Sequence, residues 1–306
     1  MQAGPISHEL RARNGDVELA GTLWLPAGEP AATVLMHPGS GPSDRHNDVF
    51  FPPIREHLLA AGIAVSSFDK RGVGSSTGRW QEAAIVEQAS DAICCLDLVQ
   101  REVDGPVGLF GHSQGAWVVV EAAARSPEPA FVICSSGGAA TPEQQERYAT
   151  QLHMRHAGIA DAELDEVRGY YDDVVGLMRA GTSLAEARRR LGERAFPEAF
   201  ATLELPVLPD DEELWSLVAA LMDYDPRPAL ERIRVPILAV FGAEDPITPV
   251  EASAAALREA VRADLLQVEI FTGAGHRLEA GDPPGLVEGY LGALTAFIPD
   301  RRSSSP

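Results

Sequence analysis

The chain has 306 residues, of which 45% are hydrophobic and 23% charged, values that are typical of a globular protein with a substantial core. Its 45 Asp and Glu residues outnumber its 25 Lys and Arg residues, which gives a formal net charge of −20. Nucleic acid and anionic membrane surfaces would repel such an acidic chain, so we expect neither as a partner.

Cysteine usage and the N-terminal residues favour a cytoplasmic protein. Cys94, Cys95 and Cys134 form neither a disulfide framework nor a C-x-x-C pair. The first residues lack the basic and apolar regions of a signal peptide, and no stretch approaches the length of about 18 apolar residues that suggests a membrane span. We expect no metal and no other cofactor, and the pattern leaves the oligomeric state open.

The first part of the chain alternates apolar runs with amphipathic runs. Asn14-Gly15 is a strong hairpin signal, and it predicts an antiparallel pair of strands on its two sides. Short apolar runs after it predict buried strands, and segments with helical spacing lie between them. The strands are expected at 6–13, 17–25, 32–36, 63–68, 107–110 and 130–134, and the helices at 49–61, 82–103 and 116–125. This alternation indicates a mostly parallel sheet with helices on both faces.

The pattern changes at about residue 139, where helical spacing replaces the alternation. Helices are expected at 142–157, 160–180, 183–191 and 212–222, and strands resume at 236–241 and 265–271 with helices at 250–261 and 286–297. The predicted organisation is therefore an α/β core at 1–138 and 231–300, a helical cap at 139–230 and a disordered tail at 301–306.

The pentapeptide Gly111-His112-Ser113-Gln114-Gly115 has the pattern G-x-S-x-G and lies between a predicted strand and a predicted helix. A strand that leads into a helix through two glycines makes a sharp turn, which strains the central serine and exposes its Oγ. The helix N-terminus offers N–H groups and partial positive charge where an oxyanion would form. Although an ordinary turn could contain serine, this context identifies Ser113 as the candidate nucleophile.

Serine is a weak nucleophile that needs a neighbouring base, which is usually a histidine oriented by a carboxylate. In an open α/β sheet such groups meet at the carboxyl ends of strands. The strand at 237–241 is followed by Glu244 and Asp245, and the strand at 265–271 is followed by His276. We expect His276 to be the base, and we favour Asp245 over Glu244 as the acid.

Two backbone N–H groups would complete an oxyanion hole. One donor is expected from Gln114, the residue after the nucleophile. The other is expected from the loop after the strand at 32–36, where Pro38 has no N–H group, so that Gly39 or Ser40 must supply it. We favour Ser40. Loss of one such donor typically costs about 3–4 kcal/mol of transition-state stabilisation.

Other polar and aromatic residues are candidates for substrate contacts. The cap, about 90 residues long, predicts an enclosed, largely apolar pocket and a medium-sized substrate. Asp69 and Arg71 could bind a charged substrate, but we favour an ion pair and hydrogen bonds that stabilise a turn. The candidate substrate contacts are His37, Gly39, Arg45, His112, Met154, Tyr171 and Trp215.

Four stretches together resemble the α/β-hydrolase superfamily, and most closely its serine aminopeptidase/esterase-like branch, which is related to dipeptidyl aminopeptidases and acylaminoacyl-peptidases. They are residues 39–45, residues 68–75, the G-x-S-x-G turn, and the loops with Asp245 and His276. The resemblance implies an α/β-hydrolase fold with an eight-stranded, mostly parallel sheet and a helical cap after the sixth strand. It also implies a Ser113-His276-Asp245 triad.

The sequence thus predicts a serine hydrolase that acts on a small-molecule acyl substrate through an acyl-enzyme. A carboxylic ester is the favoured bond, followed by a thioester or an amide, and the enzyme would be similar to carboxylesterases or peptidases. The same triad could instead hydrolyse a C–C bond, cyclise a polyketide or transfer an acyl group. A small-molecule receptor on the same fold is the less favoured alternative.

Overall fold

The computed structural model describes residues 6–192 and 208–299. The chain divides into two compact units. The first comprises residues 1–140, 226–245 and 250–306, and the second comprises residues 141–225 and 246–249. The segment expected to be a helical cap, 139–230, corresponds to most of the second unit. The expected disordered tail, 301–306, lies outside the described residues.

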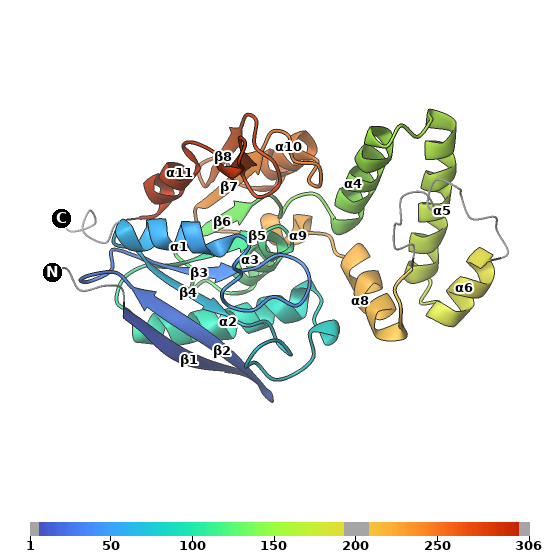
Figure 1. Ribbon diagram of the computed structural model, residues 1–306. Coiled ribbons are helices and arrows are strands. Elements are labelled where there is room, and N and C mark those ends of the chain that lie inside the picture. Colours follow the sequence, from blue (N-terminus) through green and yellow to red (C-terminus); the bar gives the residue numbers. More distant parts are fainter. Residues whose placement is uncertain (1–5, 193–207, 300–306) are drawn as a thin grey trace. The chain divides into compact units, whose positions relative to one another are not determined.

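The first unit is built on a sheet in which eight strands of the described residues take part (Figure 1). The strand order is β1-β2-β4-β3-β5-β6-β7-β8. The β1–β2 and β2–β4 pairings are antiparallel, and all later pairings are parallel, as the alternating pattern predicts. The strands are β1 (Ile6–Asn14), β2 (Val17–Leu25), β3 (Thr33–His37), β4 (Ala64–Phe68), β5 (Val107–His112), β6 (Val132–Ser135), β7 (Ile237–Gly242) and β8 (Leu266–Phe271).

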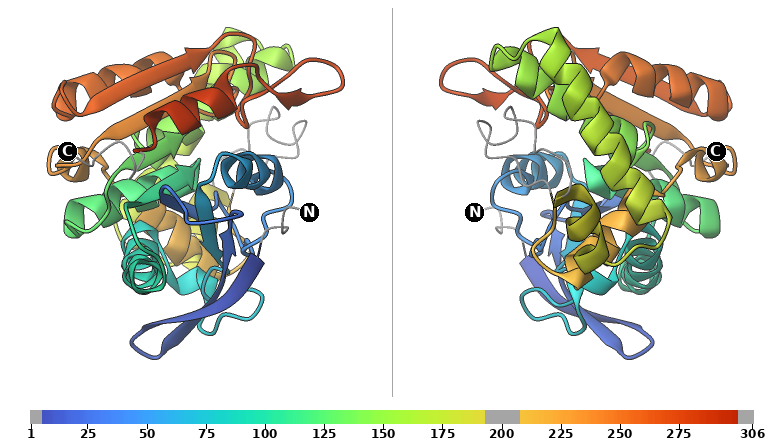
Figure 2. Two further views of the ribbon diagram at one scale, coloured as in Figure 1. Left: turned by 90° about the vertical axis from the view of Figure 1, so that its left-hand side faces the viewer. Right: turned by 90° about the vertical axis from the view of Figure 1, so that its right-hand side faces the viewer.

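Helices cover both faces of this sheet (Figure 2). On one face, α1 (Phe51–Ala60) and α11 (Tyr290–Phe297) pack on the strands through a core that includes Phe51, Phe110 and Tyr290. The opposite face carries α2, α3, α9 and α10 (Figures 1 and 2). Their bounds are α2 (Ile85–Glu102), α3 (Gln114–Arg125), α9 (Arg227–Leu230) and α10 (Val250–Ala260). Strands β4, β5, β6 and β7 are buried along their whole length, which explains their largely apolar sequences.

The end of the first unit differs from the expected helix at 286–297. The helix begins only at Tyr290, because β10 (Gly285–Leu286) pairs with β9 (Glu279–Ala280) in a separate two-stranded sheet. Gly289 then takes a left-handed φ of 87° at the start of α11. The short helix α9 and the 3-10 turn η1 (Trp80–Glu82) were likewise outside the sequence prediction, since such short elements leave little periodicity.

The second unit is helical in its described residues. It contains α4 (Pro142–His156), α5 (Asp161–Arg179), α6 (Leu184–Gly192) and α8 (Glu212–Met222). Thr141 begins α4 with a capping box, in which its Oγ accepts the Gln144 N–H at 3.1 Å and its own N–H donates to the Gln144 side chain at 3.0 Å. The unit has its own apolar core, made by residues that include Met154, Leu164, Tyr170, Met178, Leu184 and Trp215. No helix in the described residues is both long and apolar enough to span a membrane.

Candidate active site

Ser113 lies at a sharp turn between β5 and α3 in the first unit. Its backbone has φ 53° and ψ −120°, a conformation that non-glycine residues rarely adopt. The Ser113 N–H donates to the Ser135 carbonyl oxygen of β6 at 2.8 Å, which holds the strained residue in place. A Cβ atom at Gly111 would lie 2.1 Å from the Gly115 carbonyl oxygen, so the turn can close only around a glycine at position 111.

Asp245 and His276 follow β7 and β8, two neighbouring strands that come after β6 in the order of the sheet. The loops that carry them touch at Gly242, where a Cβ atom would lie 2.2 Å from the Gly275 carbonyl oxygen. The His276 Nδ1 is 2.8 Å from the Asp245 Oδ2, and the His276 Nε2 is 3.0 Å from the Ser113 Oγ. The structure therefore brings the three expected residues into one line of hydrogen bonds.

Glu244, the alternative acid, has a different partner. Its Oε1 accepts the Gly273 N–H at 3.2 Å and so stabilises the turn that leads to His276. Glu244 is exposed, whereas Asp245 is 1% exposed. The histidine contact thus belongs to Asp245, the residue that the sequence analysis favoured.

The two expected oxyanion donors lie on segments next to Ser113. Gln114 is the first residue of α3, and the first N–H groups of a helix have no acceptor within the helix. Gly39, in the loop after β3, is close to the nucleophile: a Cβ atom there would lie 3.4 Å from the Ser113 Cβ. The Ser40 N–H belongs to the peptide that directly follows Gly39.

The structure gives His112 a packing position in place of the expected substrate contact. Its ring lies 4.2 Å from the Phe50 ring and 5.1 Å from the His276 ring, and its Nδ1 is 3.3 Å from the Ser135 Oγ. Burial, together with the neighbouring charges of His276 and Arg277, lowers the pKa of His112 well below its ordinary value. A neutral ring therefore packs against His276.

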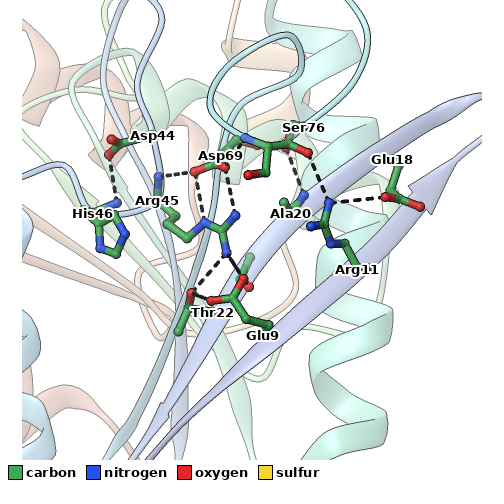
Figure 3. Close-up of polar contacts among 12 residues, drawn as sticks. Glu9, Arg11, Glu18, Ala20, Thr22, Asp44, Arg45, His46, Asp69 and Ser76 are labelled. Atoms are coloured by element: carbon green, nitrogen blue, oxygen red, sulfur yellow. Dashed lines mark hydrogen bonds and ion pairs between the residues drawn. The ribbon is translucent and has the colours of Figure 1, made fainter.

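Arg45, another candidate for substrate contact, is fully engaged by the protein (Figure 3). Its guanidinium group binds both oxygens of Asp69 at 3.1 and 2.9 Å, and it also donates to Glu9 at 2.6 Å and to the Gly21 carbonyl at 2.8 Å. Only 6% of Arg45 is exposed. The expectation of a substrate contact is wrong for this residue, because all three guanidinium nitrogens already donate to protein oxygens.

Asp69 and Arg71 do not pair with each other as expected. Burial alone would raise the pKa of the Asp69 carboxyl, but the hydrogen bonds from Arg45 and from the Ser75 N–H outweigh it and lower this pKa. Arg71 instead binds Asp91 of α2 through two hydrogen bonds of 2.7 and 2.6 Å. Both pairs stabilise the loop after β4, so its structural role was predicted correctly and its pairing was not.

The three candidates in the helical unit occupy different environments. Met154 and Trp215 belong to the core of that unit, at 0% and 2% exposure, and the Trp215 N–H donates to the Thr182 carbonyl at 2.7 Å. Both are therefore packing residues and not surface contacts. Tyr171 lines a pocket within the unit, and its hydroxyl lies 3.4 Å from the Met222 sulfur.

A buried polar cluster beside the site was missed by the sequence analysis. Lys70 donates to the loop after β3 and to the Gln114 side chain. His37, a further substrate candidate, lies 3.3 Å from the Gln88 Oε1 through its Nε2 and belongs to this cluster. Burial and the charge of Lys70 lower the pKa of His37 to about 3, which keeps the ring neutral. The available signal was that Lys70 is the only lysine of the chain.

The strand order, the turn at Ser113 and the loops after β7 and β8 define an α/β-hydrolase fold. The model of the alpha/beta hydrolase family matches residues 34–288, and the chain belongs to this family. The aminopeptidase/esterase-like branch stays a prediction. A curated relative, the human mitochondrial palmitoyl-protein thioesterase ABHD10, is 33% identical over 87 residues. That match spans 28% of this chain and only 28% of the length of the relative.

Solved structures with the same fold include two esterases. Esterase Pf2001 of Pyrococcus furiosus has a TM-score of 0.62 at 17% identity, and the match covers 96% of this chain and 90% of that one. Est1E of Butyrivibrio proteoclasticus, solved with ferulic acid bound, has a TM-score of 0.58 at 18% identity, with 94% and 95% covered. At such low identity the likeness concerns the fold alone.

Proposed function

We propose that this protein is a serine hydrolase that cleaves an ester or thioester of a medium-sized, largely apolar acyl compound. The observation that carries the proposal is the hydrogen-bonded line from Asp245 through His276 to Ser113, at 2.8 and 3.0 Å. An esterase fits the family, and a thioester is included because a curated relative bears the name of a palmitoyl-protein thioesterase. A cytoplasmic location stays a prediction from the sequence.

The reaction begins with proton transfer from Ser113 to His276. The Asp245 carboxylate accepts the Nδ1–H of His276, so the Nε2 lone pair faces the Ser113 hydroxyl. As the Oγ attacks the carbonyl carbon, the N–H groups of Gln114 and Ser40 receive the developing oxyanion. Each such donor contributes about 3–4 kcal/mol. Protonated His276 then gives its proton to the leaving alcohol or thiol, and an acyl-enzyme remains.

Water completes the cycle by the same steps. His276 takes a proton from the water molecule, which attacks the ester carbonyl of the acylated Ser113, and the second oxyanion forms at the same donors. The proton returns to the Ser113 Oγ as the carboxylic acid leaves. The sum of the two half-reactions is addition of one water across the acyl bond, and it needs no oxidant or reductant.

The helical unit contains a pocket of its own. It has a volume of about 440 Å³, which lies within the usual range for small-molecule sites. Its wall is mostly apolar and includes Tyr171, Val174, Met178, Leu214, Val218 and Met222. We propose that this pocket binds an apolar compound.

The test of the mechanism is the Ser113→Ala variant, assayed with p-nitrophenyl esters of several chain lengths. We expect hydrolysis to fall by at least about 10⁴-fold, because the nucleophile is lost while the fold is kept. Circular dichroism and the Tm check the fold. A fluorophosphonate probe should label the unaltered protein at Ser113 and leave the variant unlabelled.

Ser216→Ala is the matched control, because Ser216 is an exposed serine of α8 whose Oγ donates to the Glu212 carbonyl at 2.8 Å. It should keep full activity and full labelling. A folded Ser113→Ala protein that hydrolyses these esters at the parental rate would refute the mechanism. Absence of any adduct at Ser113 in the unaltered protein would favour the receptor alternative.

A further inference from the structure

Lys70 connects the two segments that carry the proposed oxyanion donors. Only 7% of this residue is exposed. Its Nζ donates to the backbone oxygens of Gly39 at 2.5 Å and Gly41 at 3.2 Å, and to the Gln114 Oε1 at 3.3 Å. Gly39 and Gly41 belong to the loop after β3, and Gln114 is the first residue of α3. One buried ammonium group therefore holds both sides of the proposed oxyanion hole.

The contact with Gly39 also orients the Ser40 N–H group. The Gly39 carbonyl and the Ser40 N–H belong to one planar trans peptide and point in opposite directions. Because the carbonyl points toward Lys70, the N–H points away from it. A charge-assisted hydrogen bond to the carbonyl polarises the peptide, which makes its N–H a stronger donor.

The charge of Lys70 is not neutralised by a hydrogen-bonded carboxylate in the part of the chain that the structure describes. Two acidic residues that line the same pocket as Lys70 already bind arginines: Asp69 binds Arg45, and Asp91 binds Arg71. Burial lowers the pKa of Lys70 to about 7, whereas its three carbonyl contacts favour the charged form. A buried cation of this kind acts strongly on negative charge that develops nearby.

We propose that Lys70 is a positioning residue of the hydrolysis reaction, which holds and polarises the peptide between Gly39 and Ser40 and fixes the Gln114 side chain beside it. The inference rests on the proposed function, because it gives Lys70 a part in the same site. Interactions that act only on the transition state change kcat and leave substrate binding unchanged. The role of Lys70 therefore differs measurably from a contribution to folding alone.

The experiment compares Lys70→Met with the unaltered full chain in the hydrolysis of a p-nitrophenyl ester. We expect kcat to fall on the order of 10- to 100-fold and KM to change by less than about threefold. The affinity for an alkyl trifluoromethyl ketone, whose adduct with Ser113 carries an oxyanion, should fall by the same factor as kcat. Lys70→Gln keeps a neutral donor at this position. Lys70→Gln should also lower kcat and the affinity for the ketone. If Lys70→Met does not fold, the same two quantities are measured on Lys70→Gln.

Arg71→Met is the matched control, because it removes the neighbouring, partly buried cation, which binds Asp91 of α2 and not the loop after β3. It should lower the Tm but keep kcat within about twofold. The proposal is overturned if the Lys70 variants lose no more kcat than this control, or if their loss lies in KM alone. Ser113→Ala is measured in parallel. If Ser113→Ala is inactive while the Lys70 variants keep full activity, the proposed role of Lys70 is wrong and the proposed function stands. If Ser113→Ala is active, the proposed function itself is wrong.

Discussion

The His276 ring uses both nitrogens, and each has a partner with a distinct property. The carboxylate of the buried Asp245 accepts the Nδ1–H of His276. This hydrogen bond selects the tautomer of the ring that carries its proton on Nδ1. Ser113 then faces the nitrogen that holds the lone pair. The neutral ring of His112 packs 5.1 Å from His276 and adds no positive charge that would oppose protonation of the base. These residues are arranged so that His276 can take and return a proton.

Asp245→Asn tests the tautomer argument. The asparagine amide can donate to Nδ1, which would move the ring proton to Nε2 and leave no lone pair for Ser113. We expect kcat to fall by about 10⁴-fold at neutral pH with little change in fold. Steady-state hydrolysis of a p-nitrophenyl ester measures the change.

Glu244→Gln is the control for this prediction, since it makes the same chemical change in the adjacent residue. The Glu244 Oε1 contacts the Gly273 N–H, and a glutamine oxygen can accept the same hydrogen bond. We expect its kcat to stay within about threefold of the parent. Equal losses in the two variants would show that Asp245 has no special part in orienting His276.

Among the secondary-structure elements, the junction of β5 and α3 places the nucleophile. The strand ends at His112 and the helix begins at Gln114, so Ser113 alone makes the turn. Its strained φ of 53° is maintained by the hydrogen bond to Ser135 and by the close contact between the Gly111 and Gly115 backbones. The position of the serine therefore depends on how tightly strand and helix can approach.

Gly111→Ala should open this junction. The added Cβ would lie 2.1 Å from the Gly115 carbonyl oxygen, which is backbone and cannot rotate away. We expect the free energy of unfolding to fall by at least about 2 kcal/mol and any folded fraction to lose activity. Gly176→Ala is the control, because a Cβ there meets open space within helix α5. It should raise the free energy of unfolding by about 0.5–1 kcal/mol. Urea unfolding followed by circular dichroism compares the two, and a fully stable, active Gly111→Ala would contradict the argument.

Across the whole molecule, the sheet and the line from Asp245 to Ser113 could be predicted because both follow from strand order. The carboxyl ends of parallel strands lie at one edge of a sheet. Because Asp245 and His276 each follow one of two neighbouring strands, their proximity could be predicted from the sequence. The roles of Arg45 and Trp215 were not predictable in this way, since burial of these side chains depends on partners that are remote in sequence, such as Glu9 and Thr182. Lys70 was missed because its being the only lysine of the chain does not indicate which carbonyl oxygens its ammonium group contacts.

The helical unit gives the last prediction. Its pocket of about 440 Å³ has a mostly apolar wall, so we expect it to bind an apolar compound. Val218 lines the pocket and is half-buried, so a larger side chain there would extend into the free volume. Val218→Phe should weaken the binding of a medium-chain alcohol such as 1-octanol by on the order of tenfold, measured by isothermal titration calorimetry.

Two control variants separate loss of volume from loss of stability. Ala220→Phe adds a larger side chain to the exposed side of α8, and it should leave the affinity for the alcohol unchanged. Val218→Ala enlarges the pocket and should still bind the alcohol. The Tm of each variant reports whether it is folded. If Val218→Phe is folded but binds the alcohol as tightly as Ala220→Phe does, this pocket is not the site that binds the apolar compound.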